Sequence, residues 1–227
     1  MTPRASTSPG TGVVVWLGHA APARSIRWVD GALATAARFG AATAVAAGES
    51  TWLDLAASRA TRAGVASVGI ETRLELDYLG WAQIVAAAVR MLGATTVLVD
   101  EASRRERVPE VAAIAELLDR AQLTHVVALA PDGPLVRASR IVGRELQTVR
   151  VSGPAVFGVR VAGAPVDEYS TPMPSVAMRR LDLPALGLDP LVLGHRALPP
   201  RSNAHAKKSV ERIAEHLAMH LAPGRGA

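Results

Sequence analysis

Short apolar runs alternate with helical segments along the first half of the chain, and this alternation constrains the fold most. The apolar runs lie at residues 13–17, 43–47, 66–71 and 95–99, and the helical segments at 26–39, 51–63, 78–92 and 108–118. A continuous apolar run is typical of a strand that is covered on both faces. Successive strand–helix units require right-handed crossovers, which place the strands in a parallel sheet. The sequence therefore predicts an α/β fold with a doubly wound, mostly parallel sheet.

The pattern changes towards the second half of the chain. Residues 123–129 (LTHVVAL) read as a further strand, and residues 135–140, 146–151 and 155–161 alternate or run apolar with turn residues between them. This pattern predicts an antiparallel meander of the last three segments, added to the edge of the parallel sheet. Residues 165–200 are rich in proline and show little periodicity, which predicts an ordered loop.

The two ends of the chain differ from its middle. Residues 1–12 are polar and predict a disordered leader. Residues 209–221 show an amphipathic helical pattern that follows a polar linker, so residues 201–227 are expected to form a helical arm. The apolar stripe of this arm needs a surface, either on its own domain or on a partner subunit. A single α/β domain over residues 13–200 is expected between the leader and the arm.

Composition excludes several classes of function. The chain has no cysteine, so disulfides, thiolate metal sites and cysteine nucleophiles are ruled out. Its net charge is +5, but basic and acidic residues are mixed and aromatic residues make up only 4%. A nucleic-acid-binding surface is therefore not expected. No apolar run has the roughly 18 residues that a membrane-spanning helix needs. We expect a cytoplasmic protein without membrane insertion.

Three segments of the chain resemble the beta subunit of the electron-transfer flavoproteins. They are LAASRATRAGVASVGIE at 55–71, the strand and helix at 95–118 followed by LTHVVAL, and RELQTVRVSGPAVFGVRV at 144–161 followed by MPSVAMRR. The resemblance extends over roughly residues 13–189 and depends on the order and spacing of the segments. It implies the adenine nucleotide alpha hydrolase-like type of α/β fold.

The resemblance also implies partners and cofactors. A subunit of this family pairs with a larger alpha subunit that holds most of the flavin adenine dinucleotide (FAD). The flavin takes electrons from a flavoprotein dehydrogenase and passes them to a quinone reductase or another acceptor. The beta subunit commonly binds a structural AMP, and its C-terminal arm reaches the alpha subunit. The expected role is that of an electron carrier, with no catalytic residue and no metal site in this chain.

The family's nucleotide motif is degraded in this sequence. The family carries a Gly-x-Gln-Ala-Ile-Asp-x-Asp stretch after a strand, whereas residues 97–111 read VLVDEASRRERVPEV. A remodelled AMP site would use candidates from this stretch: Asp100, Glu101, Ala102, Ser103, Arg104 and Arg105. In such a site, arginines would contact phosphate in place of the lost backbone cradle. The alternative is a solvated, charged loop, in which case the chain is a structural subunit of a larger flavoprotein complex that has lost nucleotide binding.

The family's partner-docking loop corresponds to a short apolar projection with basic residues beside it. Its candidate residues are Pro174, Ser175, Val176, Ala177, Met178 and Arg179. A single apolar anchor with charge around it suits a transient interface. For Met178 the alternative is packing against its own core.

The histidines give two further expectations. His125 lies in an apolar strand, which predicts a core residue with satisfied polar atoms. His216 and His220 lie four residues apart in the predicted arm, and a solvated helix face is favoured there over a pair of metal ligands.

Overall fold

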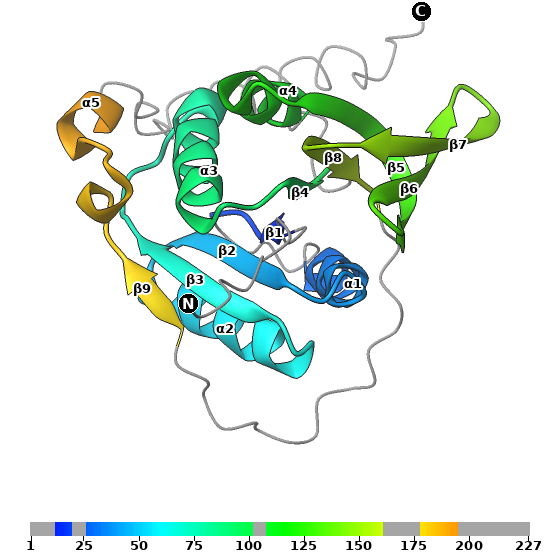
Figure 1. Cartoon of the computed structure of the whole chain (residues 1–227). Coiled ribbons are helices and arrows are strands. Elements are labelled where there is room, and N and C mark those ends of the chain that lie inside the picture. The colour runs from blue at the N-terminus through cyan, green and yellow to red at the C-terminus, as the bar shows by residue number, and fades with distance from the viewer. Residues whose placement is uncertain (1–11, 20–25, 102–107, 161–177, 195–227) are drawn as a thin grey trace, which may run out of the picture.

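The computed structural model describes residues 12–19, 26–101, 108–160 and 178–194, which form one nine-stranded sheet with helices on both faces (Figure 1). The strands are β1 (Val13–Trp16), β2 (Ala42–Gly48), β3 (Ala66–Glu71), β4 (Thr96–Asp100), β5 (Ala121–Asp132), β6 (Leu135–Val142), β7 (Glu145–Ser152), β8 (Ala155–Val159) and β9 (Arg179–Leu181). The helices are α1 (Ile26–Ala37), α2 (Ser50–Arg62), α3 (Tyr78–Leu92), α4 (Val108–Leu118), a 3-10 turn η2 (Pro184–Leu186) and α5 (Pro190–Gly194). The order across the sheet is β7-β6-β5-β8-β4-β1-β2-β3-β9.

The predicted α/β class and the mostly parallel sheet are confirmed. Strands β1 to β4, β8 and β9 pair in parallel, and β1 lies between β2 and β4. The four predicted helices in the first half of the chain agree with α1 to α4 to within about two residues at each end. Every residue of β1 and β4 is buried, as their continuous apolar runs predict.

The core has two layers, one on each face of the sheet. One layer joins α1 and α2 to alternate residues of the central strands, such as Val13 and Val15. The other joins α3 and α4 to the intervening residues, such as Val14 and Trp16. This alternation follows from the period of two along a strand. The chain thus changes face between β3 and β4, which makes the sheet doubly wound.

Local signals in the sequence set the ends of α3. The Asp77 carboxylate accepts a hydrogen bond of 2.7 Å from the backbone N–H of Gly80, which caps the first turn. Gly93 ends the helix with a φ of +62°, a left-handed conformation that glycine adopts without steric cost.

The predicted position of residues 155–161 in the antiparallel meander is wrong. β8 lies between β4 and β5 and pairs with both in parallel, while β5, β6 and β7 form the antiparallel part. All five residues of β8 are buried, and this burial on both faces fits an interior strand of the sheet. The ribbon of β6 and β7 therefore extends the sheet beyond β5, and the chain returns to the interior of the sheet at β8.

The loop predicted at residues 165–200 contains regular structure where it is described. β9 pairs in parallel with β3 at the edge of the sheet opposite the ribbon, and η2 and α5 follow it. Leu183 and Leu193 are buried against the layer formed by α3 and α4, which explains why this segment is ordered. The predicted leader at 1–12 lies outside the described residues except for Gly12, and the predicted arm at 201–227, with His216 and His220, lies wholly outside them.

Candidate functional site at the carboxyl ends of the parallel strands

The parallel strands bring the carboxyl ends of β1, β2, β3, β4 and β8 to one edge of the sheet. The strand order reverses between β1 and β4, because β1 leads to β2 on one side and the chain returns to β4 on the other. In open α/β sheets, ligands bind beyond the carboxyl ends of the strands at such a switch point. The described residues nearest the switch point are His19 after β1, and Asp100 and Glu101 at the end of β4.

Glu101 is a buried carboxylate at this edge. Its side chain has no exposed surface, and its backbone N–H donates to the Val159 carbonyl oxygen at 3.1 Å. Its Oε2 accepts from the backbone N–H of His125 at 2.5 Å, and Nδ1 of the His125 ring lies 2.6 Å from Oε1. A Cβ atom on Gly158 would lie 3.0 Å from Oε2, so the neighbouring strand leaves room for this carboxylate through a glycine.

His125 has an unusual backbone conformation. Its φ is +61°, and it lies where the pairing of β5 with β8 shifts register between Leu123 and Val126. A left-handed conformation costs a non-glycine residue on the order of 1 kcal/mol. The side chain is 41% exposed, so the prediction of a core histidine is wrong in its burial, although Nδ1 has a partner in Glu101. Arg160 also faces Glu101, with Nε 3.9 Å from Oε2.

A cluster of aromatic rings lies beside the switch point. The indole N–H of Trp16 donates to Glu110 of α4 at 2.7 Å, and the rings of Trp16 and Trp81 lie 6.3 Å apart. The His19 ring stacks on Trp81, with 4.2 Å between the ring centroids. Glu110 is buried, so its hydrogen bond to Trp16 ties α4 to the end of β1.

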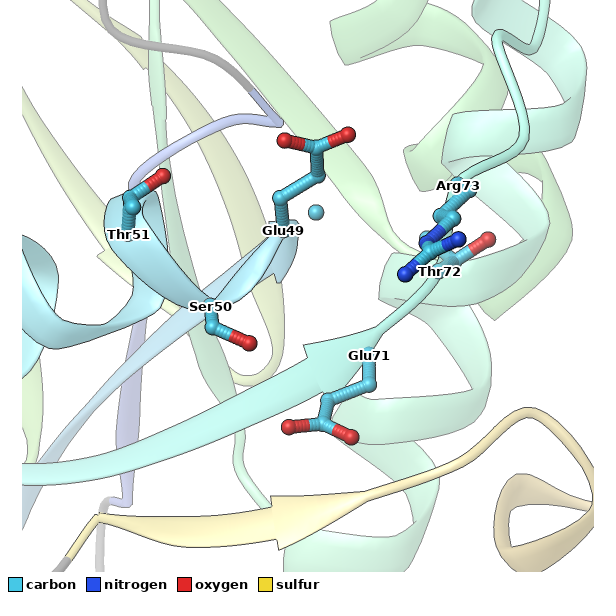
Figure 2. A pocket seen from close by; sticks show the side chains of 7 residues that line it. Glu49, Ser50, Thr51, Glu71, Thr72 and Arg73 are labelled. Atoms are coloured by element: carbon cyan, nitrogen blue, oxygen red, sulfur yellow. The ribbon is translucent and has the colours of Figure 1, made fainter.

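A hollow of about 290 Å3 lies at the ends of β2 and β3 (Figure 2). Its lining comprises Gly48, Glu49, Ser50, Thr51, Glu71, Thr72 and Arg73. Figure 2 shows Ser50 and Thr51 at the start of α2 on one side and Arg73 on the other. Gly48 has a φ of +136°, and a Cβ there would lie 2.8 Å from the His19 carbonyl oxygen. Only glycine therefore suits the close approach of the loops after β1 and β2.

An exposed ionic cluster holds β9 against the body of the protein. The guanidinium of Arg180 donates to Glu71 at 2.5 Å and to Asp54 at 2.6 Å. The hydrogen bond to Glu71 is the largest cause of a raised pKa of Arg180. These contacts hold β9 against β3 and α2.

The structure describes only part of the candidate docking segment. Pro174, Ser175, Val176 and Ala177 lie outside them. Met178 is half-buried and packs on the core, with its sulfur 2.5 Å from the position of a Cβ on Gly69. This contact favours the alternative in which Met178 packs against its own domain. Arg179 is exposed in β9 and remains a candidate contact.

The structure likewise describes only some of the candidate nucleotide residues. Ala102, Ser103, Arg104 and Arg105 lie outside the described residues, whereas Asp100 and Glu101 are buried, with 1% and 4% of their surface exposed. The first two residues of this stretch are therefore not part of a solvated loop. The sequence did not indicate the contact of Glu101 with His125, or the hollow at Gly48. For the hollow, a signal was present in the polar residues that directly follow the apolar strands β2 and β3.

Comparison with known proteins makes no family assignment, because no protein-family model and no curated protein matches the sequence significantly. Within the described residues, no three or more His, Asp or Glu side chains are grouped as a metal site. In the same part of the chain, no helix has the length and apolar character that crossing a membrane requires.

Proposed function

We propose that this chain is the beta subunit of a heterodimeric electron-transfer flavoprotein. In this role it helps a larger alpha subunit to enclose FAD, which the alpha subunit holds for the most part. The flavin carries electrons from a flavoprotein dehydrogenase to a quinone reductase or another acceptor. The chain helps to set the distance and orientation of the flavin for electron transfer, and its nearby charges tune the potential of the flavin. It supplies no catalytic group of its own.

The observation that carries the proposal is the position of the resembling segments in the fold. Residues 55–71 cover most of α2 and all of β3, residues 95–129 cover β4, α4 and most of β5, and residues 144–161 cover β7 and β8. Each segment thus contains at least one strand of the sheet, and β4 and β5 of the second segment lie on either side of β8 of the third. The doubly wound sheet is also compatible with the adenine nucleotide alpha hydrolase-like fold that the resemblance implies.

The edge at β9 supports a docking role for the segment that ends there. Arg180 ties β9 to Glu71 and Asp54, which leaves the neighbouring Arg179 exposed at the margin of the sheet. An exposed guanidinium next to a fixed edge suits a partner with acidic groups, and charge complementarity chiefly increases the rate of association. Arg179 is therefore the described residue that best tests docking of a dehydrogenase.

A second candidate function is favoured by Glu101. Its buried carboxylate is fully engaged with His125 at the end of β4, where the resemblance implies a nucleotide. A side chain in that place favours a structural subunit of a larger flavoprotein complex that has lost AMP. Heat denaturation of the purified complex distinguishes the two candidates, because a conventional subunit releases AMP and a structural subunit releases none.

The decisive experiment is purification of the tagged chain from its native source, followed by cofactor analysis. We expect a yellow complex with a second chain of roughly 30 kDa or more that releases FAD, whereas the chain expressed alone is colourless. Recovery of the native protein as a single chain without flavin overturns the proposal.

A charge reversal tests docking separately from assembly. Arg179→Glu should slow reduction of the complex by its dehydrogenase roughly tenfold at low salt, and leave the flavin content unchanged. Arg137→Glu, an equal charge change at an exposed position in β6, is the matched control. Equal reduction rates for both variants would show that Arg179 is not part of the docking surface.

A further inference from the structure

The hollow at the ends of β2 and β3 has a wholly polar lining. Apart from Gly48, every residue that lines it carries a charge or a hydroxyl group. Its volume of about 290 Å3 is at the lower end of the range for ligand pockets, which begins at about 300 Å3. A small polar molecule therefore suits the hollow, whereas an apolar ligand or one the size of FAD does not. None of the lining comes from β4, where the resemblance implies AMP.

Backbone contacts hold the two sides of the hollow together. The backbone N–H of Thr72 donates to the Gly48 carbonyl oxygen at 3.3 Å, which joins the chain after β3 to the end of β2. The Thr72 hydroxyl accepts a hydrogen bond of 3.1 Å from the backbone N–H of Leu74. Leu74 in turn packs on the core layer that contains α3 and α4. The backbone on either side of Arg73 is therefore fixed.

Two opposite charges line this hollow without pairing. Figure 2 shows Glu49 on the side of α2 and Arg73 on the side of β3. Glu49 is the N-cap residue of α2, but its carboxylate makes no capping hydrogen bond. Within the described part of the chain, neither side chain forms an ion pair or a hydrogen bond, and both are exposed. A ligand with one cationic and one anionic group can bind to both.

The charges around the hollow sum to zero. Glu71 is already engaged, because Arg180 donates to its Oε1 at 2.5 Å. The carboxylates of Glu49 and Glu71 thus balance the guanidinium groups of Arg73 and Arg180. A site of this kind suits a ligand that is neutral overall and carries complementary charges. A phosphate dianion would instead face two carboxylates.

We propose that the hollow binds a free L-α-amino acid with a small polar side chain, such as serine. Arg73 binds the carboxylate of the ligand, because a guanidinium matches the geometry of a carboxylate. Glu49 accepts hydrogen bonds from its ammonium group. The hydroxyls of Ser50 and Thr51 supply donors and acceptors for its side chain. The site requires neither flavin nor a second subunit, so it goes beyond the proposed function.

The test titrates the full-length chain with L-serine at pH 7 in a calorimeter. We expect saturable binding. Two compounds each lack one charge of serine: ethanolamine has no carboxylate, and 3-hydroxypropanoate has no ammonium group. Each should bind at least tenfold more weakly than serine, because one hydrogen-bonded charge is lost. Inorganic phosphate should also bind more weakly than serine.

Two variants assign the groups that bind. Arg73→Met and Glu49→Gln should each weaken serine binding at least tenfold. Both residues are exposed, so the circular dichroism spectrum should remain unchanged. Arg137→Met and Glu145→Gln make the same changes at exposed positions of the ribbon, and they should leave serine binding unchanged.

Three results would overturn the proposal: absence of saturable serine binding, wild-type affinity in Arg73→Met or Glu49→Gln, or phosphate binding as tight as that of serine. The last result would indicate a simple anion site at the start of α2. The test uses this chain alone and measures no flavin, so its failure leaves the subunit assignment open.

Discussion

The parallel body of the sheet, which comprises β1 to β4 and β8, and the antiparallel ribbon of β6 and β7 differ sharply in burial. In β4 and β8 every residue is buried, whereas no residue of β7 is buried and exposed residues alternate with half-buried ones in much of the strand. The ribbon also carries exposed apolar side chains at its end: Ile141, Val142 and Leu146. Its side chains join in exposed polar pairs, such as the hydroxyls of Ser139 and Thr148 at 3.4 Å. Packing therefore dictates the sequence of the body, but only weakly that of the ribbon.

The difference implies that stability is concentrated in the body. A buried side chain contributes through removal of apolar surface from water and through close packing, whereas an exposed pair contributes little. The ribbon contacts the rest of the molecule mainly through β5, whose register shift at His125 marks the boundary between the two regions. Substitutions on the two sides of this boundary should therefore differ in their effect on unfolding.

The largest effect is expected for Phe157→Ala in β8. Phe157 is fully buried, and its removal leaves a cavity in the layer that contains α1 and α2. The free energy of unfolding should fall by about 3–5 kcal/mol. Urea denaturation followed by circular dichroism measures the change, with Phe157→Leu as a control that should lose less. A loss below about 1 kcal/mol for Phe157→Ala would show that the body is not packed as described.

A smaller effect is expected for Glu110→Ala at the functional edge. The substitution leaves the buried indole N–H of Trp16 without the oxygen that accepts it at 2.7 Å. An unsatisfied buried donor costs about 1–3 kcal/mol, which is the expected destabilisation. Glu110→Gln keeps an acceptor oxygen and should restore most of the loss. Equal stability of the two variants would indicate that the carboxylate itself, rather than its hydrogen bond, is what matters.

The body of the fold was largely predictable from the sequence, because its strands are apolar on both faces and its helices have clear ends. Gly93 after α3 and the buried runs of β1 and β4 are local signals of this kind. The position of β8 was not predictable in the same way. An apolar run indicates burial but does not specify its neighbours, and β8 follows directly on an antiparallel ribbon. β9 was missed because three residues are too few to show a period.

The candidate site was less predictable than the fold. Asp100 and Glu101 were identified as site residues, but their burial was not, since charged residues after a strand are usually exposed. The partner of Glu101 is His125, which is 24 positions away and reaches it only through a register shift and a positive φ. Neither feature has a signal in local sequence, because both depend on which strands become neighbours.

The smallest effect is expected for Leu146→Ala in β7. Leu146 is 67% exposed, so its truncation removes little buried surface, and the free energy of unfolding should change by less than about 0.5 kcal/mol. The same denaturation experiment measures it, with Phe157→Ala as the reference for the body. A loss comparable to that of Phe157→Ala would mean that the ribbon is covered in solution. Such a loss would depend on protein concentration if a second copy of the chain provides the cover. Analytical ultracentrifugation at two concentrations therefore distinguishes a covered ribbon from one that is free to contact another protein.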